Sequence, residues 1–364
     1  MFTNFFPSAT ITRYLAWLFL TRTFGVLIAL VLVLQSLDLL GQTGKILAFE
    51  GNGTPEILTY ISLRLPQIIQ QFLPFSVLLG TLITFMTLNA NSEIVSMKSA
   101  GLSAHQVLAP FIVASLFVAA ISFTFNERIA SRATATLDKW QRAEYAAIPK
   151  DPRSQLNIWV RDGANLINAA EVTGRGNATR LTGVTVYNRE GGELRSIVRA
   201  NSAMPLGDKW EVKGARLFDV AKGTQVDLGT ISVGTGISAD QFTLANVDAD
   251  RLSFVELWTA IADLKAAGRP TGSLEAGLWH KLSGPLSSLL MPLLAAVAAF
   301  GIARSGKLFI RAVIGMALGV TYFFSDNFAL VMGDLGAYPP LLAAWGPFVL
   351  FLLVGETVLI QTEE

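Results

Sequence analysis

The residue types that most often carry chemistry are scarce in this chain of 364 residues. It contains no cysteine, which excludes disulfides and thiolate metal sites. Its two histidines, His105 and His280, are too few for a histidine metal cluster, and neither lies in a nucleophile motif such as G-x-S-x-G. The sequence therefore predicts no catalytic centre, no metal and no cofactor in the chain.

One stretch is similar to a phosphate-binding loop. The segment "GIARSGKL", residues 301–308, matches the first seven positions of G-x-x-x-x-G-K-[ST]. Leu308 replaces the hydroxyl that would hold Mg²⁺, and a long apolar run precedes the segment where the motif requires a strand. We interpret it as a basic turn and expect no nucleotide site in this chain.

The stretch "NSEIVSMKSAGLS", residues 91–103, has the pattern of a short helix between two long apolar runs. Glu93 stands where the helix dipole favours an acid, and Gly101 is a typical C-terminal stop. Ile94, Val95, Met97 and Lys98 fall on successive turns. Residues 91–101 are therefore predicted to form a helix that could fit a groove on a partner protein. A solvated connector would show the same pattern.

Two acids, Asp38 and Asp326, lie inside apolar runs. A charged side chain is costly in hydrocarbon, so each acid is expected either to face a cavity or to pair across a subunit contact. The sequence leaves their role open. His280, between Trp279 and Lys281, is interpreted as an anchor at a membrane interface rather than as a base.

The composition is that of a polytopic α-helical membrane protein. Hydrophobic residues make up 52% of the chain, charged residues only 15%, and the mean hydropathy is +0.48. The net charge of +1 gives no indication of a nucleic-acid partner. Six apolar runs are long enough for a hydrocarbon core of ~30 Å: residues 23–40, 65–91, 106–126, 282–303, 312–333 and 335–355. An interfacial helix around residues 13–22 is expected before the first of them.

Basic residues in the short loops predict the orientation. Those on one side of the six predicted spans are Arg13, Arg22, Lys98, Arg304, Lys307 and Arg311. The positive-inside rule assigns that side to the cytoplasm. Both termini are then expected in the cytoplasm, and the long insert after the third span on the opposite side.

Residues 128–252 change to short alternating segments separated by turn dipeptides. Asp162-Gly163, Gly191-Gly192 and Lys222-Gly223 are typical of hairpin turns. We predict an inserted all-β, jelly-roll-like or sandwich domain of about ten short strands. Residues 253–364 are expected to begin with an amphipathic helix that returns the chain to the membrane and to contain the last three spans. Residues 1–127 would hold the first three spans and the short helix.

This order of parts resembles the LptF/LptG family of lipopolysaccharide export permeases over essentially the full chain. "FLPFSVLLGTL" followed by "NSEIVSMKSAGLS" resembles the second span and coupling helix of the family. "DLKAAGRPTGSLEAGLWHKLSGPLSSLLMPLLA" and "LGAYPPLLAAWGPF" resemble the LptG branch more than the LptF branch.

The resemblance implies a permease subunit of an ABC transporter in the inner membrane of a Gram-negative bacterium, with its β-domain in the periplasm. Such a subunit extracts lipopolysaccharide and passes it to a periplasmic bridge. The implied partners are an LptF-like permease, an LptB-like ATPase dimer that holds ATP and Mg²⁺, an LptC-like membrane-anchored periplasmic protein and an LptA-like bridge. Coupling to the ATPase is then expected from Glu93, Ile94, Met97, Lys98 and Gly101.

The expected substrate site departs from the family pattern. Basic residues of the family near the end of span one and after the proline of span two correspond here to Gln35, Gly41, Gln42 and Gln67. The nearest cations for lipid A phosphates are Lys45, Arg64, Arg128 and Arg132. The resemblance makes span one part of a lateral gate. Helical spacing predicts its wall from Val26, Leu30, Val33 and Leu37, although plain lipid-facing residues would show the same spacing.

Three alternatives remain at this point: an LptF-type partner of the same transporter, a membrane-anchored periplasmic binding or sensor module, and a membrane-embedded enzyme. A sensor module would not need a structured helix between spans two and three. An enzyme would need paired acids or a metal site, and the sequence offers neither clearly.

Overall fold

The computed structural model describes residues 6–146, 155–162, 164–174, 178–190, 193–206, 209–233, 242, 248–266, 268–300 and 308–361. The chain forms two compact units. The helical unit comprises Met1–Leu137 and Ala249–Glu364, and the sheet unit comprises Asp138–Asp248. The sheet unit is slightly shorter than the insert proposed from the sequence, which runs from residue 128 to residue 252.

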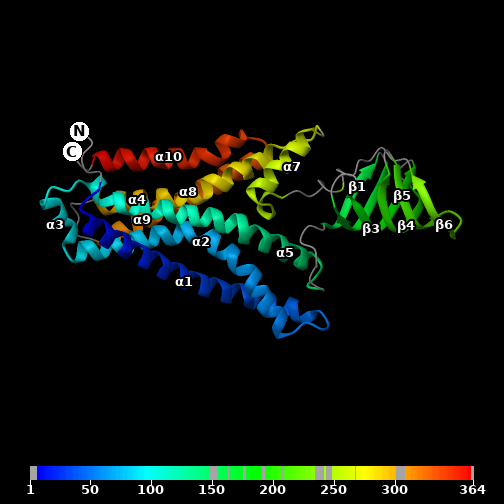
Figure 1. Cartoon of the computed structure of the whole chain (residues 1–364), viewed down its shortest axis with the longest axis horizontal. Helices are drawn as coiled ribbons and strands as arrows, with labels where there is room; N and C mark the ends of the chain where they lie inside the picture. The colour runs from blue at the N-terminus through cyan, green and yellow to red at the C-terminus, as the bar shows by residue number, and fades with distance from the viewer. Residues whose placement is uncertain are drawn as a thin grey trace. The chain divides into compact units, whose positions relative to one another are not determined.

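Long helices make up the helical unit (Figure 1). They are α1 (Ala9–Ala48), α2 (Thr54–Ala90), α3 (Glu93–Ser99), α4 (Ala104–Phe125), α5 (Ser131–Arg142), α7 (Phe254–Ala266), α8 (Gly272–Phe300), α9 (Leu308–Asp334) and α10 (Pro340–Gln361). A π-helical turn, η1 (Asn126–Ala130), joins α4 to α5, and a 3-10 turn, η3 (Ala249–Arg251), precedes α7. The unit is built around one buried apolar cluster to which α1, α2, α3, α4, α8, α9 and α10 all contribute.

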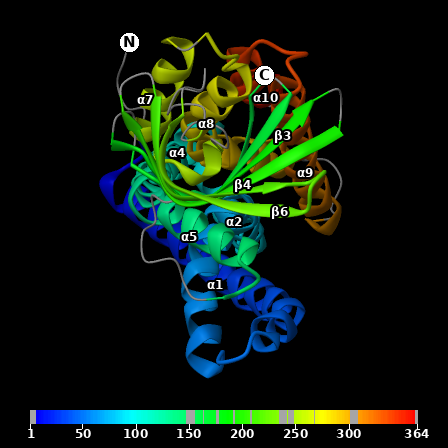
Figure 2. The same ribbon diagram turned by 90° about the vertical axis from the view of Figure 1, so that its right-hand side faces the viewer.

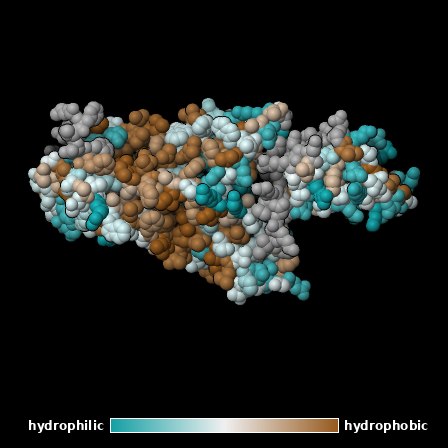
Figure 3. All heavy atoms as spheres, in the orientation of Figure 1, coloured by the Kyte–Doolittle hydropathy of each residue, from teal (hydrophilic) through white to brown (hydrophobic). Residues whose placement is uncertain are grey.

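Five described helical segments are long and apolar enough to cross a membrane. They are α1, α2, the continuous run Ala104–Arg142, the part Val313–Asp334 of α9, and α10. These segments contain or largely overlap the predicted first, second, third, fifth and sixth spans. The space-filling view in Figure 3 shows a broad hydrophobic band across the middle of this unit, with hydrophilic residues at its ends. Such a band is what a bilayer requires.

The predicted fourth span, residues 282–303, lies mainly in α8, which is not among these five segments. Helix α8 packs against α2, α4, α9 and α10. The polar side chains of Lys281, Ser283, Ser287 and Ser288 on α8 are buried. Since α8 is surrounded by protein, its buried polar side chains do not face lipid. Residues 301–307, where the span was expected to end, lie outside the described residues, as does most of "GIARSGKL".

Two helix boundaries differ from the sequence prediction. The interfacial helix expected around residues 13–22 is not separate, because α1 runs without a break from Ala9 to Ala48. At 1.5 Å per residue this helix is about 60 Å long, so it extends beyond a hydrocarbon core of ~30 Å. The third predicted span likewise continues through η1 into α5 instead of ending at residue 126.

Both ends of the described helical chain lie at the same end of the helical unit as α3 (Figure 1). Two polar contacts agree with this placement. Tyr14 near the start of α1 bonds to Glu93 at the start of α3, and His105 at the start of α4 lies 3.4 Å from Glu356 near the end of α10. The α1–α2 loop and α5 lie at the opposite end (Figure 1).

The sheet unit is a single antiparallel sheet with strands in consecutive order (Figure 2). Its strands are β1 (Gln155–Asp162), β2 (Asn165–Thr173), β3 (Arg180–Glu190), β4 (Glu193–Leu206), β5 (Lys209–Asp219) and β6 (Thr224–Val233). Each predicted hairpin is confirmed by the pairing of its strands: Asp162 with Asn165, Glu190 with Glu193, and Asp219 with Thr224. Gly163, Gly191 and Gly192 themselves lie outside the described residues.

The all-β character of the insert is confirmed, but the described residues form six strands rather than about ten. Several strands are longer than the sequence indicated, and β4 alone has 14 residues. A consecutive meander also lacks the crossing connections of a jelly roll. One face of the sheet carries its own apolar cluster, which includes Ile158, Val184, Trp210 and Phe242.

Helices α1 and α2 approach most closely where Gly80 faces Thr23. A Cβ atom added at Gly80 would lie 2.7 Å from both the Cα and the backbone N of Thr23. These atoms belong to the backbone of α1 and cannot turn aside, so glycine is required here by the close helix contact.

We predict that Gly80→Ala forces α1 away from α2 and destabilises the protein by about 1–3 kcal/mol, as overpacking does in tight cores. Thermal unfolding of the purified chain in detergent measures the effect. Gly25→Ala is the matched control, because a Cβ atom at Gly25 on α1 meets nothing within 4 Å. Equal melting temperatures for the two variants would contradict the assigned contact.

Candidate functional site

Helix α3 forms because its two ends are fixed by tight turns. It begins after Ser92, whose φ of 59° is left-handed, and ends before Gly101, whose φ is 88°. The N–H of Gly101 donates to the Lys98 carbonyl (3.0 Å), and that of Leu102 donates to the Met97 carbonyl (3.1 Å). This is a glycine-based C-cap of the Schellman type. The predicted helix and its stop at Gly101 are confirmed, although the helix has seven residues.

Glu93 joins α3 to the first helix. The hydroxyl of Tyr14 on α1 donates to both carboxylate oxygens of Glu93, at 3.0 and 3.3 Å, and the side-chain amide of Asn91 donates at 3.2 Å. The sequence did not reveal Tyr14, which precedes Glu93 by 79 residues. This contact directly joins α3, which is expected to bind a partner protein, to α1, which is expected to form part of a gate.

The coupling residues predicted from the sequence divide between two faces of α3. Ile94 is only 4% exposed and belongs to the central apolar cluster, and the half-buried Met97 packs against that cluster. Lys98 and Gly101 are exposed, and so is Val95, whose exposed fraction is 65%. Ile94 and Met97 therefore anchor the helix, whereas Val95 and Lys98 lie on its exposed face. Val95 is an apolar surface residue that the predicted set omitted.

The four predicted substrate cations are toward the other end of the helical unit. Lys45 in the last turn of α1, Arg128 in η1 and Arg132 in α5 are exposed. Arg64 on α2 is half-buried and differs from them, because it forms an ion pair. Arg64 is therefore not a free cation. The sequence had suggested it as one of four cations for lipid A phosphates.

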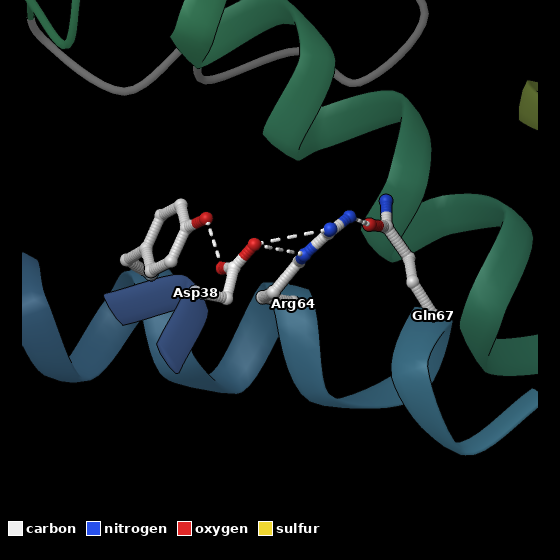
Figure 4. A network of polar contacts seen from close by, with 4 residues as sticks. Asp38, Arg64 and Gln67 are labelled. Atoms are coloured by element: carbon white, nitrogen blue, oxygen red, sulfur yellow. Dashed lines mark hydrogen bonds and ion pairs between the residues drawn. The ribbon is translucent and has the colours of Figure 1, made fainter. Parts of the chain in front are cut away.

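The ion pair of Arg64 is with Asp38 on α1 (Figure 4). Both Nη2 and Nε of Arg64 bind Oδ1 of Asp38, at 3.1 and 3.2 Å, and Nη1 donates to Oε1 of Gln67 at 2.5 Å. The hydroxyl of Tyr60 donates to Oδ2 of Asp38 at 2.5 Å. The guanidinium and carboxylate thus satisfy each other inside the predicted first span, where an unpaired charge would be costly. Asp38 pairs within its own chain rather than across a subunit contact.

The residues of α1 that were predicted to form the wall of the gate lie at the edge of the buried face of this helix. The side chains that pack inward recur every four residues and are Thr23, Leu27, Val31 and Gln35. Val26 and Leu30 are half-buried, whereas Val33 and Leu37 are 59% and 61% exposed. Only Val33 and Leu37 of the predicted stripe therefore present most of their surface outside this chain.

Asp326 on α9 also has a partner within the chain. Its carboxylate lies 3.9 Å from Nε2 of His280 on α8, and the Ser283 hydroxyl lies 3.4 Å from Nδ1 of the same ring. Asp326 is only 8% exposed. His280 is thus a partly buried partner of an acid within the chain, and its role as an anchor at a membrane interface stays a prediction. The described residues contain no group of three or more metal-binding side chains.

Helix α7 is fixed at both ends. The Glu127 carboxylate, next to Arg128, accepts from the backbone N–H groups of Phe254 (2.6 Å) and Val255 (3.4 Å) at the start of α7. At the other end, Lys265 Nζ lies 2.9 Å from Glu275 Oε1 of α8. The Thr271 hydroxyl, and after it Lys265, lower the pKa of Glu275 despite partial burial. Helix α7, which follows the sheet unit in the chain, is therefore hydrogen-bonded to η1, the turn that carries Arg128.

We predict an energetic coupling of about 1–2 kcal/mol between Asp38 and Arg64, which is modest because both side chains are partly exposed. Asp38→Asn and Arg64→Gln should each lower the melting temperature, and the double variant should lose less than the sum. Thermal unfolding in detergent measures this cycle. Asp38→Asn combined with Lys45→Gln is the control pair and should be additive. Additivity of the Asp38 and Arg64 changes would contradict the pairing.

Comparison with known proteins agrees with this architecture. Residues 13–361 match the family "Lipopolysaccharide export system permease LptF/LptG". The lipopolysaccharide export system permease protein LptG of Escherichia coli (strain K12) is 24% identical, over 98% of this chain and 99% of that protein. The LptG protein of Haemophilus influenzae is 23% identical, over 95% of this chain and 96% of that protein. The match covers the helical segments and also the sheet, which is inserted between them in the sequence. This chain therefore belongs to the LptF/LptG family of lipopolysaccharide export permeases.

Proposed function

We propose that this chain is the LptG-type subunit of a transporter that extracts lipopolysaccharide from the inner membrane and passes it to a periplasmic bridge. An LptF-like permease would complete the membrane part, and LptC-like and LptA-like proteins would receive the lipid. Both termini and α3 would face the cytoplasm, and the sheet unit the periplasm. The basic residues Arg13, Arg22 and Lys98 in the segments on the α3 side support this orientation.

The energy for extraction would come from a separate LptB-like ATPase dimer that binds ATP and Mg²⁺. Withdrawing acyl chains from a bilayer costs about 0.8 kcal/mol for each CH₂ group, which far exceeds thermal energy for a lipid with several chains. The chain itself lacks the hydroxyl that a phosphate-binding loop needs at Leu308.

One observation carries the coupling part of the proposal: α3 combines an outward apolar side chain with a firm attachment to the transmembrane helices. Val95 is exposed on one face, while Ile94 is buried in the central cluster on the other. Glu93 adds the hydrogen bond to Tyr14 of α1. A push on α3 by a partner would therefore reach α1 through packed side chains and one polar contact, without a flexible link.

The substrate would be bound on the opposite side of the membrane. Lys45, Arg128 and Arg132 are exposed there and can form charge-assisted hydrogen bonds with phosphate groups. Arg64 would contribute only if the substrate phosphate replaced Asp38. The exposed side chains of Val33 and Leu37 on α1 would contact acyl chains at a lateral gate.

We predict that Glu93→Lys releases the ATPase or uncouples hydrolysis from export, because it reverses the charge at the start of α3 and removes the acceptor of Tyr14. Co-purification of the ATPase and export by the reconstituted complex measure the two effects. Val95→Asp should weaken ATPase binding while leaving the Tyr14 contact intact. Tyr14→Phe is the control for that contact and should retain the ATPase. Normal assembly and export in Glu93→Lys would refute a coupling role for α3.

We predict that photocrosslinkers at Val33, Leu37 and the three exposed cations capture lipopolysaccharide in a transporting complex. Leu350 and Leu353 on α10 are matched control positions, since they are apolar and 57% and 61% exposed. Equal capture at α1 and α10 would indicate plain lipid contact. No capture at any α1 or cation position would place the path on the partner permease.

A further inference from the structure

The outer face of the sheet unit carries a row of polar and aromatic residues that the apolar cluster does not use. We define the outer face as the one opposite that cluster. One residue from each strand forms the row, and each is directly paired with the next: Trp159, Asn168, Thr185, Arg199, Arg216 and Asp227. Neighbouring residues such as Ile158, Ala200 and Ala215 are buried on the other face. The row is therefore surface rather than core.

Two like charges stand directly opposite each other in this row. Arg199 on β4 is paired with Arg216 on β5, and both are exposed. Like charges at directly opposed positions destabilise a sheet. Within the described part of the chain neither arginine forms an ion pair with an acid. Asp227, which stands opposite Arg216, instead accepts from the backbone N–H of Gly229 at 2.9 Å. Two exposed arginines at directly opposed positions can hold an anion between their guanidinium groups.

The other end of the row is an exposed aromatic surface with a fixed orientation. Trp159 on β1 is 50% exposed, and its ring stacks on Tyr187 of β3 with centroids 5.7 Å apart and an interplanar angle of 18°. Its indole N–H donates to Oδ1 of Asn157 at 3.1 Å, and the Asn168 amide donates to the same oxygen at 2.7 Å. A ring held in this way loses little conformational entropy on binding a ligand.

The spacing of these groups suits a short acidic saccharide. Trp159 and Arg199 are three strands apart, which corresponds to about 14 Å. The C–H faces of a sugar ring can pack on an exposed aromatic ring, while hydroxyl groups bond to the amide of Asn168 and the hydroxyl of Thr185. A phosphate or carboxylate on a following sugar would then reach Arg199 and Arg216.

We propose that this row binds an anionic saccharide, with a sugar ring on Trp159 and an acidic group between Arg199 and Arg216. The proposal rests on the proposed function for the source of the ligand, which would be the saccharide part of the exported lipid. It adds to that function a contact for the sugar that is separate from the lipid A cations and from the acyl-chain gate.

The test uses the full chain, purified in detergent, and the phosphorylated core oligosaccharide released from lipopolysaccharide by delipidation. Arg199→Gln, Arg216→Gln and Trp159→Ala should each weaken binding about tenfold, the effect of losing one strong contact. Arg180→Gln on β3 is the matched control, because it removes one exposed positive charge outside the row, and it should leave the affinity unchanged. The dephosphorylated oligosaccharide should bind the unaltered chain about as weakly as the arginine variants bind the phosphorylated one.

Four results would overturn the proposal. An equal loss in Arg180→Gln would indicate general charge attraction, and unchanged affinity in the row variants would place the sugar elsewhere. Row variants that lose binding only to sugar-free phosphatidylglycerol vesicles would indicate that the row binds a membrane surface.

The melting temperature of Arg199→Gln should stay the same or rise, because the variant removes the repulsion between the two arginines. A fall in melting temperature would show that the arginines stabilise the fold instead. Export by the complete complex is measured separately for the row variants. Normal export together with unchanged sugar affinity in these variants would refute the sugar site and leave the proposed export function intact.

Discussion

The hydrocarbon core of a bilayer contains no water for polar groups, and this constraint explains most features of the helical unit. Each described acid within a predicted span has a partner within the chain: Asp38 pairs with Arg64, and Asp326 lies beside His280. Two buried hydroxyl groups of α2 follow the same rule, since Thr81 and Thr84 donate to carbonyls one turn earlier in that helix. Helices approach closely where a glycine permits it, as Gly80 does at Thr23.

The same constraint separates the roles of the helices. Helix α8 is enclosed by its neighbours and can bury Ser283, Ser287 and Lys281, whereas α1 and α10 present apolar side chains outward. Helix α3 sits at one end, where Ile94 ties it to the common apolar cluster. The sheet unit follows a different rule. It buries its own cluster on one face and leaves polar and charged side chains, such as Arg199 and Arg216, on the other.

The sequence predicts features that depend on local patterns and misses those that depend on distant partners. Hydropathy locates five of the spans, Gly101 marks the end of α3, and the turn dipeptides locate the hairpins, because each signal lies within a few residues. The pairing of Arg64 joins residues 26 positions apart on different helices, so Arg64 was taken for a free cation. The contact of His280 with Asp326 likewise joins two different helices. The buried stripe of α1 was missed because Thr23 and Gln35 are polar. More strands were expected than the described residues form, because long strands contain irregular positions, such as the register shift after Val212.

We propose that this chain uses energy from a separate ATPase to move lipopolysaccharide out of the membrane. The most direct measurement reconstitutes the chain with its partner permease and the ATPase in proteoliposomes that contain lipopolysaccharide, and follows transfer of the lipid to a soluble acceptor protein. The account predicts transfer that requires both ATP and this chain. Transfer at the same rate without ATP, or with the chain omitted, would contradict it.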